Sequence, residues 1–189
     1  MKKVLHPILL GLLIILNSSF KTELLFGIEI WQHGKPVKIS KQVVLLDKEP
    51  FQIKVSLYKQ EGVFVNASVQ ENYFKLQDSE PIANLADWPA NTFAESTFNV
   101  DQDLILDSEG VGYWFYNKKK DWHRFDSSVV LGENVVIGTK SISHFFVPSV
   151  QKTMDISDIK SPIYLFLVAA KEGRKIKELQ RQKIMIIWK

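Results

Sequence analysis

Single-residue alternation between apolar and polar side chains restricts the fold of this chain more than any other feature of its sequence. Every second residue is apolar over residues 51–58, and the same rhythm repeats over residues 63–69. A period of two separates the side chains of a β-strand onto two faces, whereas an amphipathic helix has a period near 3.6. Turn-forming residues that end in Gly62 separate the two segments. The sequence therefore predicts a β-hairpin over residues 51–69 that buries its apolar face.

Further short strands are expected along the rest of the chain, with turns at residues 33–36 and at several glycines. The predicted strands cover residues 28–30, 37–46, 104–106, 111–116, 122–126, 129–131, 135–139, 142–147, 163–170 and 183–188. The strand at 163–170 is apolar on both faces, which is typical of a central strand covered on both sides, and residues 183–188 are again apolar on both faces. Residues 174–182 contain good helix formers, but the flanking apolar runs favour a strand within a long final hairpin. Because strands do not alternate with helices, we predict a mainly all-β fold, either an antiparallel β-sandwich or an open barrel.

One segment departs from this pattern. Residues 78–100 contain Pro81 and Pro89, and Ser79 is a suitable N-cap for a short helix that reaches Ala86. A structureless loop of this length is uncommon in a compact domain. We therefore expect one short helical or irregular insertion at about 78–100.

The N-terminal residues 1–19 have the order of a secretory signal peptide. Lys2 and Lys3 precede an apolar run over residues 4–16, and small polar residues follow at 17–19. The run is short for a membrane helix, which needs about 20 apolar residues. We expect cleavage to leave residues 20–189 as a single β-sandwich domain that is periplasmic or secreted. The cleavage region lacks the usual alanines, so an uncleaved anchor, with membrane contact, is the alternative.

The charge balance limits the classes of partner that are expected, and the cysteine content limits how the fold can be stabilised. Without Lys2 and Lys3 the chain keeps 22 basic and 21 acidic residues, so its net charge is close to neutral. No general attraction to nucleic acid is expected from such a balance. The chain has no cysteine. A disulfide therefore cannot hold the fold, and its stability must come from the hydrophobic core.

Residues 112–126 are the strongest candidate for a binding surface. They are predicted to form a hairpin with its tip at 117–120, and aromatic residues lie on both of its faces. Aromatic side chains beside basic ones can stack on sugar rings or fill a protein interface. Together with the insertion, this hairpin supplies the candidate binding residues Trp88, Trp114, Tyr116, Lys119, Trp122 and Arg124. The alternative is that both faces are packed and the lysines only keep the turn soluble.

Acidic residues repeat with a strand period before this hairpin. Asp101, Asp103, Asp107 and Glu109 fall on one face, and such oxygen ligands suit calcium. Their spacing differs from the helix-loop-helix calcium motif, so Asp101, Asp103 and Asp107 are weak metal candidates beside the alternative of a solvated polar face. The same acids would supply the paired carboxylates of a hydrolase.

Motifs for other chemistry are missing from the sequence. His33, His123 and His144 have no second histidine at ligand spacing, and no glycine-rich nucleotide loop occurs, so no cofactor is expected. Ser143 precedes His144, but no nucleophile elbow accompanies the pair. These observations favour a non-catalytic binding or interaction module of the cell envelope, with a protein or glycan partner. The alternatives are an exported hydrolase that uses paired carboxylates and a periplasmic inhibitor or immunity protein.

Overall fold

The computed structural model describes most of the predicted strand regions. The described residues are 24–58, 62–69, 71, 104–105, 113–117, 126–132, 135–147, 152–171 and 177–189. The predicted signal peptide (1–19) and the predicted insertion at about 78–100 lie outside these ranges.

Sheet I contains five strands in the order β2-β1-β4-β9-β8, with antiparallel neighbours throughout. Its members are β1 (Phe26–Gln32), β2 (Lys35–Val37), β4 (Phe51–Tyr58), β8 (Ser127–Leu131) and β9 (Val135–Ile142). The predicted turn after β1 is confirmed. His33 and Gly34 have φ angles of 53° and 73° there, which is the left-handed pair that a two-residue hairpin turn requires.

Sheet II also contains five strands, in the order β3-β13-β12-β5-β7. Its members are β3 (Val43–Leu46), β5 (Gly62–Ser68), β7 (Tyr113–Asn117), β12 (Ile163–Lys171) and β13 (Lys177–Trp188). Antiparallel β12 and β13 confirm the predicted final hairpin, and residues 177–182 are strand. The β3 strand runs parallel to β13. Sheet II is therefore mixed, whereas the sequence predicted antiparallel strands.

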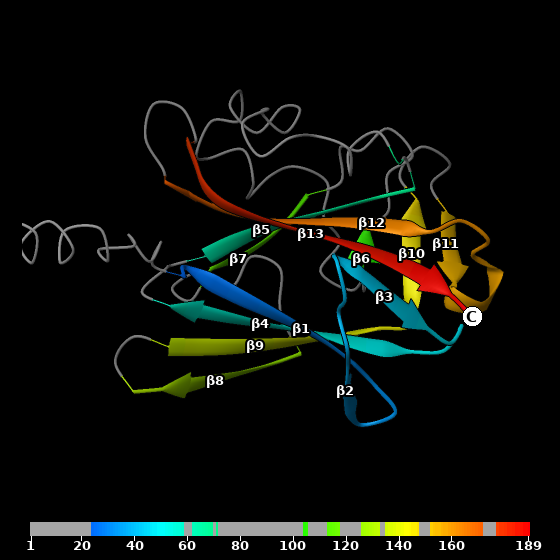
Figure 1. Cartoon of the computed structure of the whole chain (residues 1–189), viewed down its shortest axis with the longest axis horizontal. Coiled ribbons are helices and arrows are strands. Elements are labelled where there is room, and N and C mark those ends of the chain that lie inside the picture. The colour runs from blue at the N-terminus through cyan, green and yellow to red at the C-terminus, as the bar shows by residue number, and fades with distance from the viewer. Residues whose placement is uncertain are drawn as a thin grey trace, which may run out of the picture.

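A smaller sheet III joins β11 (Lys152–Asp155), β10 (His144–Val147) and β6 (Leu104–Ile105). The β6 strand is parallel to β10, and a short 3-10 helix over Ile156–Asp158 follows β11. Figure 1 shows β10 and β11 at one side of the molecule, near the C-terminus of the chain.

Sheets I and II enclose one hydrophobic core. Along β4 the burial alternates residue by residue, because Phe51, Ile53, Val55 and Leu57 all point into this core. The same cluster contains Leu165 from β12 and side chains from sheet III. Burial of these large apolar side chains is the main stabilising contribution in a chain without disulfides.

The central strand β12 is buried on both of its faces. Ile163, Leu165 and Leu167 belong to the shared core, whereas Phe166 and Val168 point the other way and are 0% and 2% exposed. This confirms the prediction that a strand apolar on both faces lies at the centre of its sheet.

The predicted hairpin over residues 51–69 is wrong. The β4 strand pairs with β1 and β9 in sheet I, while β5 pairs with β12 and β7 in sheet II. Alternation shows that one face of each strand is buried, but it does not identify the neighbouring strand. Here the two apolar faces meet across the core, so the chain crosses between sheets where a hairpin was expected. The all-β class, built as a sandwich, is confirmed.

Candidate functional site

The predicted aromatic site is described only at β7. Trp114 is the register partner of Val65, and Tyr116 is the partner of Val63. Directly opposite residues of an antiparallel pair lie on one face of the sheet. For Trp114 and Tyr116 the structure describes no more than this register, so their role in a binding surface stays a prediction.

The other predicted site residues lie outside the described ranges. They are Trp88, Lys119, Trp122 and Arg124 of the aromatic surface and Asp101, Asp103 and Asp107 of the acidic face. Their assignments therefore stay predictions.

The most distinctive described surface is the strand β8 at one end of sheet I. All five of its residues are exposed, and Val129, Val130 and Leu131 keep 54%, 67% and 51% of their surface accessible. We call these three residues the apolar edge. Among the described strands β8 pairs with β9 only, so no described strand lies beside one row of its backbone groups. A strand edge of this kind can pair with another polypeptide chain.

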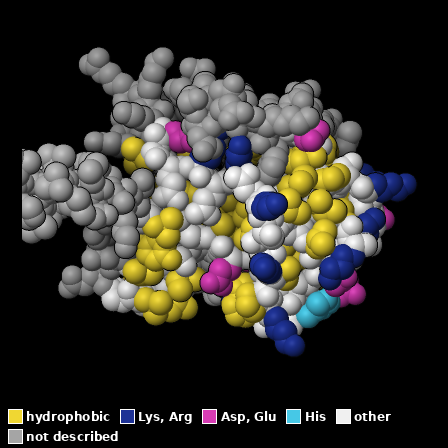
Figure 2. Space-filling view, in the orientation of Figure 1, with side chains coloured by type: hydrophobic (Ala, Val, Ile, Leu, Met, Phe, Trp, Pro, Cys, Tyr) yellow, Lys and Arg dark blue, Asp and Glu magenta, His cyan; other side chains and the backbone are white. Residues whose placement is uncertain are grey.

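The apolar edge continues onto the outer face of sheet I. Val129 is the register partner of Ile137, and Leu131 is the partner of Val135. Val135 in turn pairs with Tyr58 on β4. Figure 2 shows apolar side chains gathered where Figure 1 places the ends of β4, β8 and β9. The exposed edge and this face therefore form one apolar region.

Asp126 attaches the start of β8 to the neighbouring strand β9. Its backbone N–H donates to the carbonyl of Thr139 at 2.8 Å, and its carboxylate accepts the N–H of Ser141 at 2.5 Å. The same carboxylate lies 3.3 Å from the Nζ of Lys140, whose side chain is only 8% exposed. These contacts hold Asp126 against β9, and its carboxylate compensates the charge of the inward-facing Lys140.

The opposite part of the outer face of sheet I is polar. The Nζ of Lys54 lies 3.3 Å from the centre of the Trp31 ring, and the indole N–H of Trp31 donates to Glu29 at 2.7 Å. A cation over an aromatic ring is held by the electrostatic field of the ring. Lys54 thus occupies one face of Trp31 and leaves that face unavailable for sugar stacking.

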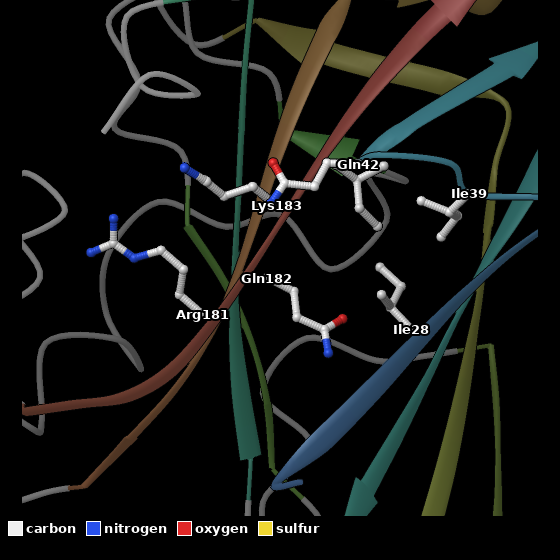
Figure 3. A pocket seen from close by; sticks show the side chains of 7 residues that line it. Ile28, Ile39, Gln42, Arg181, Gln182 and Lys183 are labelled. Carbon is white, nitrogen blue, oxygen red and sulfur yellow. The ribbon is translucent and has the colours of Figure 1, made fainter. Parts of the chain in front are cut away.

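A pocket of about 290 Å³ opens between β1 and β13, at the seam of the two main sheets. Ile28, Ile39 and Ile184 supply its apolar wall, and Gln42 and Gln182 supply amides; Arg181 and Lys183 complete the lining. Figure 3 shows that the side chains of Arg181 and Lys183 extend away from Ile28 and Ile39. The pocket therefore directs no acid, base or nucleophile at a ligand, and its geometry does not indicate catalysis.

Ser143, His144 and Asp155 form a surface chain of polar contacts. Ser143 Oγ lies 2.8 Å from His144 Nδ1, and His144 Nε2 lies 3.1 Å from Asp155 Oδ1. A serine hydrolase needs these three groups in a sheltered site. Here the side chains of His144 and Asp155 are 51% and 64% exposed, and the two residues are cross-strand partners in β10 and β11. These polar contacts are best explained as a link between β10 and β11 at the surface.

A second polar cluster closes the end of sheet I beside β2. His33 lies 3.3 Å from Asp47 and 3.7 Å from Glu49, and Lys189 lies 3.4 Å from Asp47. The hydrogen bond from His33, assisted by Lys189, holds the pKa of the Asp47 carboxyl below its ordinary value. All four side chains are at least 41% exposed. Their attraction is therefore screened by water and contributes little to stability.

Buried Gln32 supports the same end of the sheet. Its amide nitrogen donates to the carbonyls of Asp47 and Glu49, and its amide oxygen accepts the N–H of Asp47, all at 3.0 Å. The side chain is therefore fully engaged in holding the loop that follows β3.

The described ranges contain neither a metal-binding cluster nor a helix able to span a membrane. No set of three or more His, Cys, Asp or Glu residues there has an arrangement that would hold a metal ion. No helix in the same ranges combines the length and hydropathy needed to cross a membrane. Comparison with known proteins adds no assignment: no family model, curated protein or solved structure matches this chain.

Proposed function

We propose that this chain is a non-catalytic binding module of the cell envelope, and that β8 binds an extended segment of a partner polypeptide by strand addition. The observation that carries the proposal is the apolar edge: three consecutive aliphatic residues, each more than half exposed, on a strand with pairing on one side. Strand addition uses backbone hydrogen bonds for affinity and alternate side-chain contacts for specificity.

The chemistry of β8 selects the kind of partner. The strand consists of two serines followed by Val129, Val130 and Leu131, so it contains no charge. An added segment would lie about 4.8 Å away and place its side chains beside these residues. Such a neighbour is favourable when it is extended, apolar and uncharged at its centre, because a charge there would lose water without gaining a partner. A glycan, the other partner expected from the sequence, has no peptide N–H and C=O groups and so cannot add to β8 as a strand.

The envelope location rests on the leader-like order of residues 1–19, in which two lysines precede an apolar run. An exported protein meets partners in the periplasm or outside the cell. A function in binding also agrees with the described polar clusters, because they are solvated structural links.

Site-specific photo-cross-linking in cells that export the full chain tests this function. A photoreactive amino acid replaces Val130, the most exposed residue of the apolar edge, and a matched chain carries it at Thr153 on β11. We expect a covalent protein adduct from position 130 and none from position 153. Adding Val129→Lys to the first chain should remove at least nine-tenths of the adduct.

Three results would contradict the proposal. They are the lack of an adduct at position 130, equal adducts at positions 130 and 153, and an adduct that persists with Val129→Lys. A glycan ligand whose binding is indifferent to Val129→Lys would also overturn it.

A further inference from the structure

The geometry points to a second copy of this chain as the partner of β8: we propose that two copies pair their β8 strands in antiparallel orientation about a two-fold axis at Val129. This inference rests on strand addition at β8, as proposed above. It specifies which extended segment is added.

The symmetric register follows from the alternation of side chains. With Val129 opposite its own copy, Ser127 lies opposite Leu131, and Ser128 lies opposite Val130. Each pair joins residues of the same face, as a continuous sheet requires. A small hydroxyl side chain then lies beside a larger aliphatic one, and the two copies of Val129 form the central contact.

Charge supports the self-pairing. A two-fold contact brings residues near their own copies, so a charged strand would repel itself. The β8 strand has no charged residue, and the nearest described charge is that of Asp126. In this register Asp126 lies opposite Gly132 of the second copy. Gly132 has a φ of 65°, and an added Cβ there would meet no atom within 4 Å, so there is free space around this turn residue.

The same symmetry gives an assembly of limited size. Joining the two copies of sheet I through β8 yields the order β2-β1-β4-β9-β8-β8-β9-β4-β1-β2, which is within the usual limit of about ten strands for a twisted sheet. Both ends of the joined sheet are then β2, a strand of three residues that carries Lys35 and Pro36. Lysine and proline on a short edge strand oppose further pairing, so the product is a closed dimer and not a fibre.

The size of the contact sets its strength. A five-residue strand is about 17 Å long, and stable interfaces bury roughly 1,200–2,000 Å². A contact between two strands this short, with the adjoining side chains of Leu131 and Ile137, is smaller than such an interface and belongs to the weak, transient class. We therefore expect association in the micromolar range, with the dimer fraction rising with protein concentration.

Sedimentation of the purified exported chain between about 1 and 500 μM tests the inference with a charge-swap pair. The wild type should show a monomer–dimer equilibrium. Val129→Lys and Val129→Glu should each weaken self-association at least tenfold, because each places two like charges at the axis. An equimolar mixture of the two variants should associate again, to within a few-fold of the wild type. Thr153→Lys on β11 is the matched control, and it should leave association unchanged.

The outcomes separate this inference from the proposed function. A wild type that stays monomeric at 500 μM, while position 130 still forms an adduct that Val129→Lys removes, would overturn the self-pairing and keep strand addition to another protein. A dimer that is insensitive to Val129→Lys, or a mixture that does not recover, would also overturn the self-pairing. Recovery in the mixture additionally shows that both variants are folded.

Discussion

The two edges of sheet I differ in length, chemistry and anchoring. The β2 edge has three residues, includes Lys35 and Pro36, and adjoins the loop that buried Gln32 holds. The β8 edge has five uncharged residues with its apolar members more than half exposed. Edge strands in soluble proteins are normally protected by short length, charge or proline. Among the described strands, sheet I therefore has one protected edge and one unprotected edge, and this difference supports the proposal that β8 binds a partner strand.

The outer face of the same sheet repeats this contrast. Near β2 it carries the Glu29–Trp31–Lys54 group, in which aromatic and charged side chains contact one another. Near β8 it carries Val129, Leu131 and their partners on β9. Exposed apolar patches on soluble proteins commonly mark interaction sites.

Replacing Gln32 should change the free energy of unfolding more than any other substitution, because Gln32 holds the loop beside the β2 edge. Gln32→Ala removes three hydrogen bonds from a side chain that is 5% exposed and leaves two backbone carbonyls and one N–H without that partner. We expect the free energy of unfolding to fall by about 2–3 kcal/mol. Urea denaturation measures the change. Ser127→Ala on β8 is the control, with an expected change under about 0.5 kcal/mol. Equal losses of stability in the two variants would contradict the claim that the β2 edge is held more firmly than the β8 edge.

Asp126 tests the attachment of β8 at its first residue. Asp126→Asn leaves the Lys140 ammonium, with an 8% exposed side chain, without its carboxylate, and weakens the bond to the Ser141 N–H. Because Asp126 itself is 42% exposed, we expect a moderate loss of about 1–2 kcal/mol. Denaturation of Asp126→Asn in a Lys140→Met background should show less than half of this loss. An equal loss in both backgrounds would mean that the pair is not coupled.

The polar part of the outer face should contribute less. Lys54→Met removes the charge over Trp31 while keeping a long apolar side chain. We expect a decrease of about 0.5–1 kcal/mol in stability and no change in self-association. Thermal unfolding and sedimentation of the same sample check the two parts. A change in association would show that binding is not confined to the β8 side.

Asp47 should give the smallest effect, visible only in its pH dependence. Its pKa is lowered in the folded protein from 3.8, chiefly by the hydrogen bond with His33, so folding favours the ionised carboxylate. The resulting stability is present above pH 3.8 and is lost as the pH falls through the lower folded pKa. Thermal melts should therefore show Asp47→Asn slightly less stable than the wild type at pH 7, with the difference shrinking as the pH falls below 3.8. A difference that does not shrink as the pH falls below 3.8 would exclude this origin.

The sequence predicts much of the architecture because burial leaves a clear pattern. Alternation located β4, and apolar residues on both faces identified β12 as a central strand. The pairing of β4 was not predictable in the same way, since neighbours in a sheet depend on contacts distant in sequence. A short connection between two alternating segments is compatible with a hairpin and with a crossing between sheets.

The candidate site was less predictable than the fold. The aromatic residues of 112–126 predicted a binding surface there, whereas the unprotected edge is β8 at 127–131, where the sequence predicted only an ordinary strand over 129–131. Its sequence signal is the uncharged run of serines, valines and leucine before Gly132. That run does not reveal whether the strand is central or at an edge, because both positions accept aliphatic residues. Only the sheet order distinguishes them.

Cysteine cross-linking at the two edges tests the central claim most directly. The chain has no native cysteine, so a Val129→Cys chain and a Lys35→Cys chain each carry one thiol. Opposite residues of paired strands have Cα atoms about 4.5–5.5 Å apart, within the range that a disulfide spans. With a copper oxidant, the account predicts rapid covalent dimers from Val129→Cys and almost none from Lys35→Cys. Equal yields at both edges, or no dimer from Val129→Cys, would contradict it.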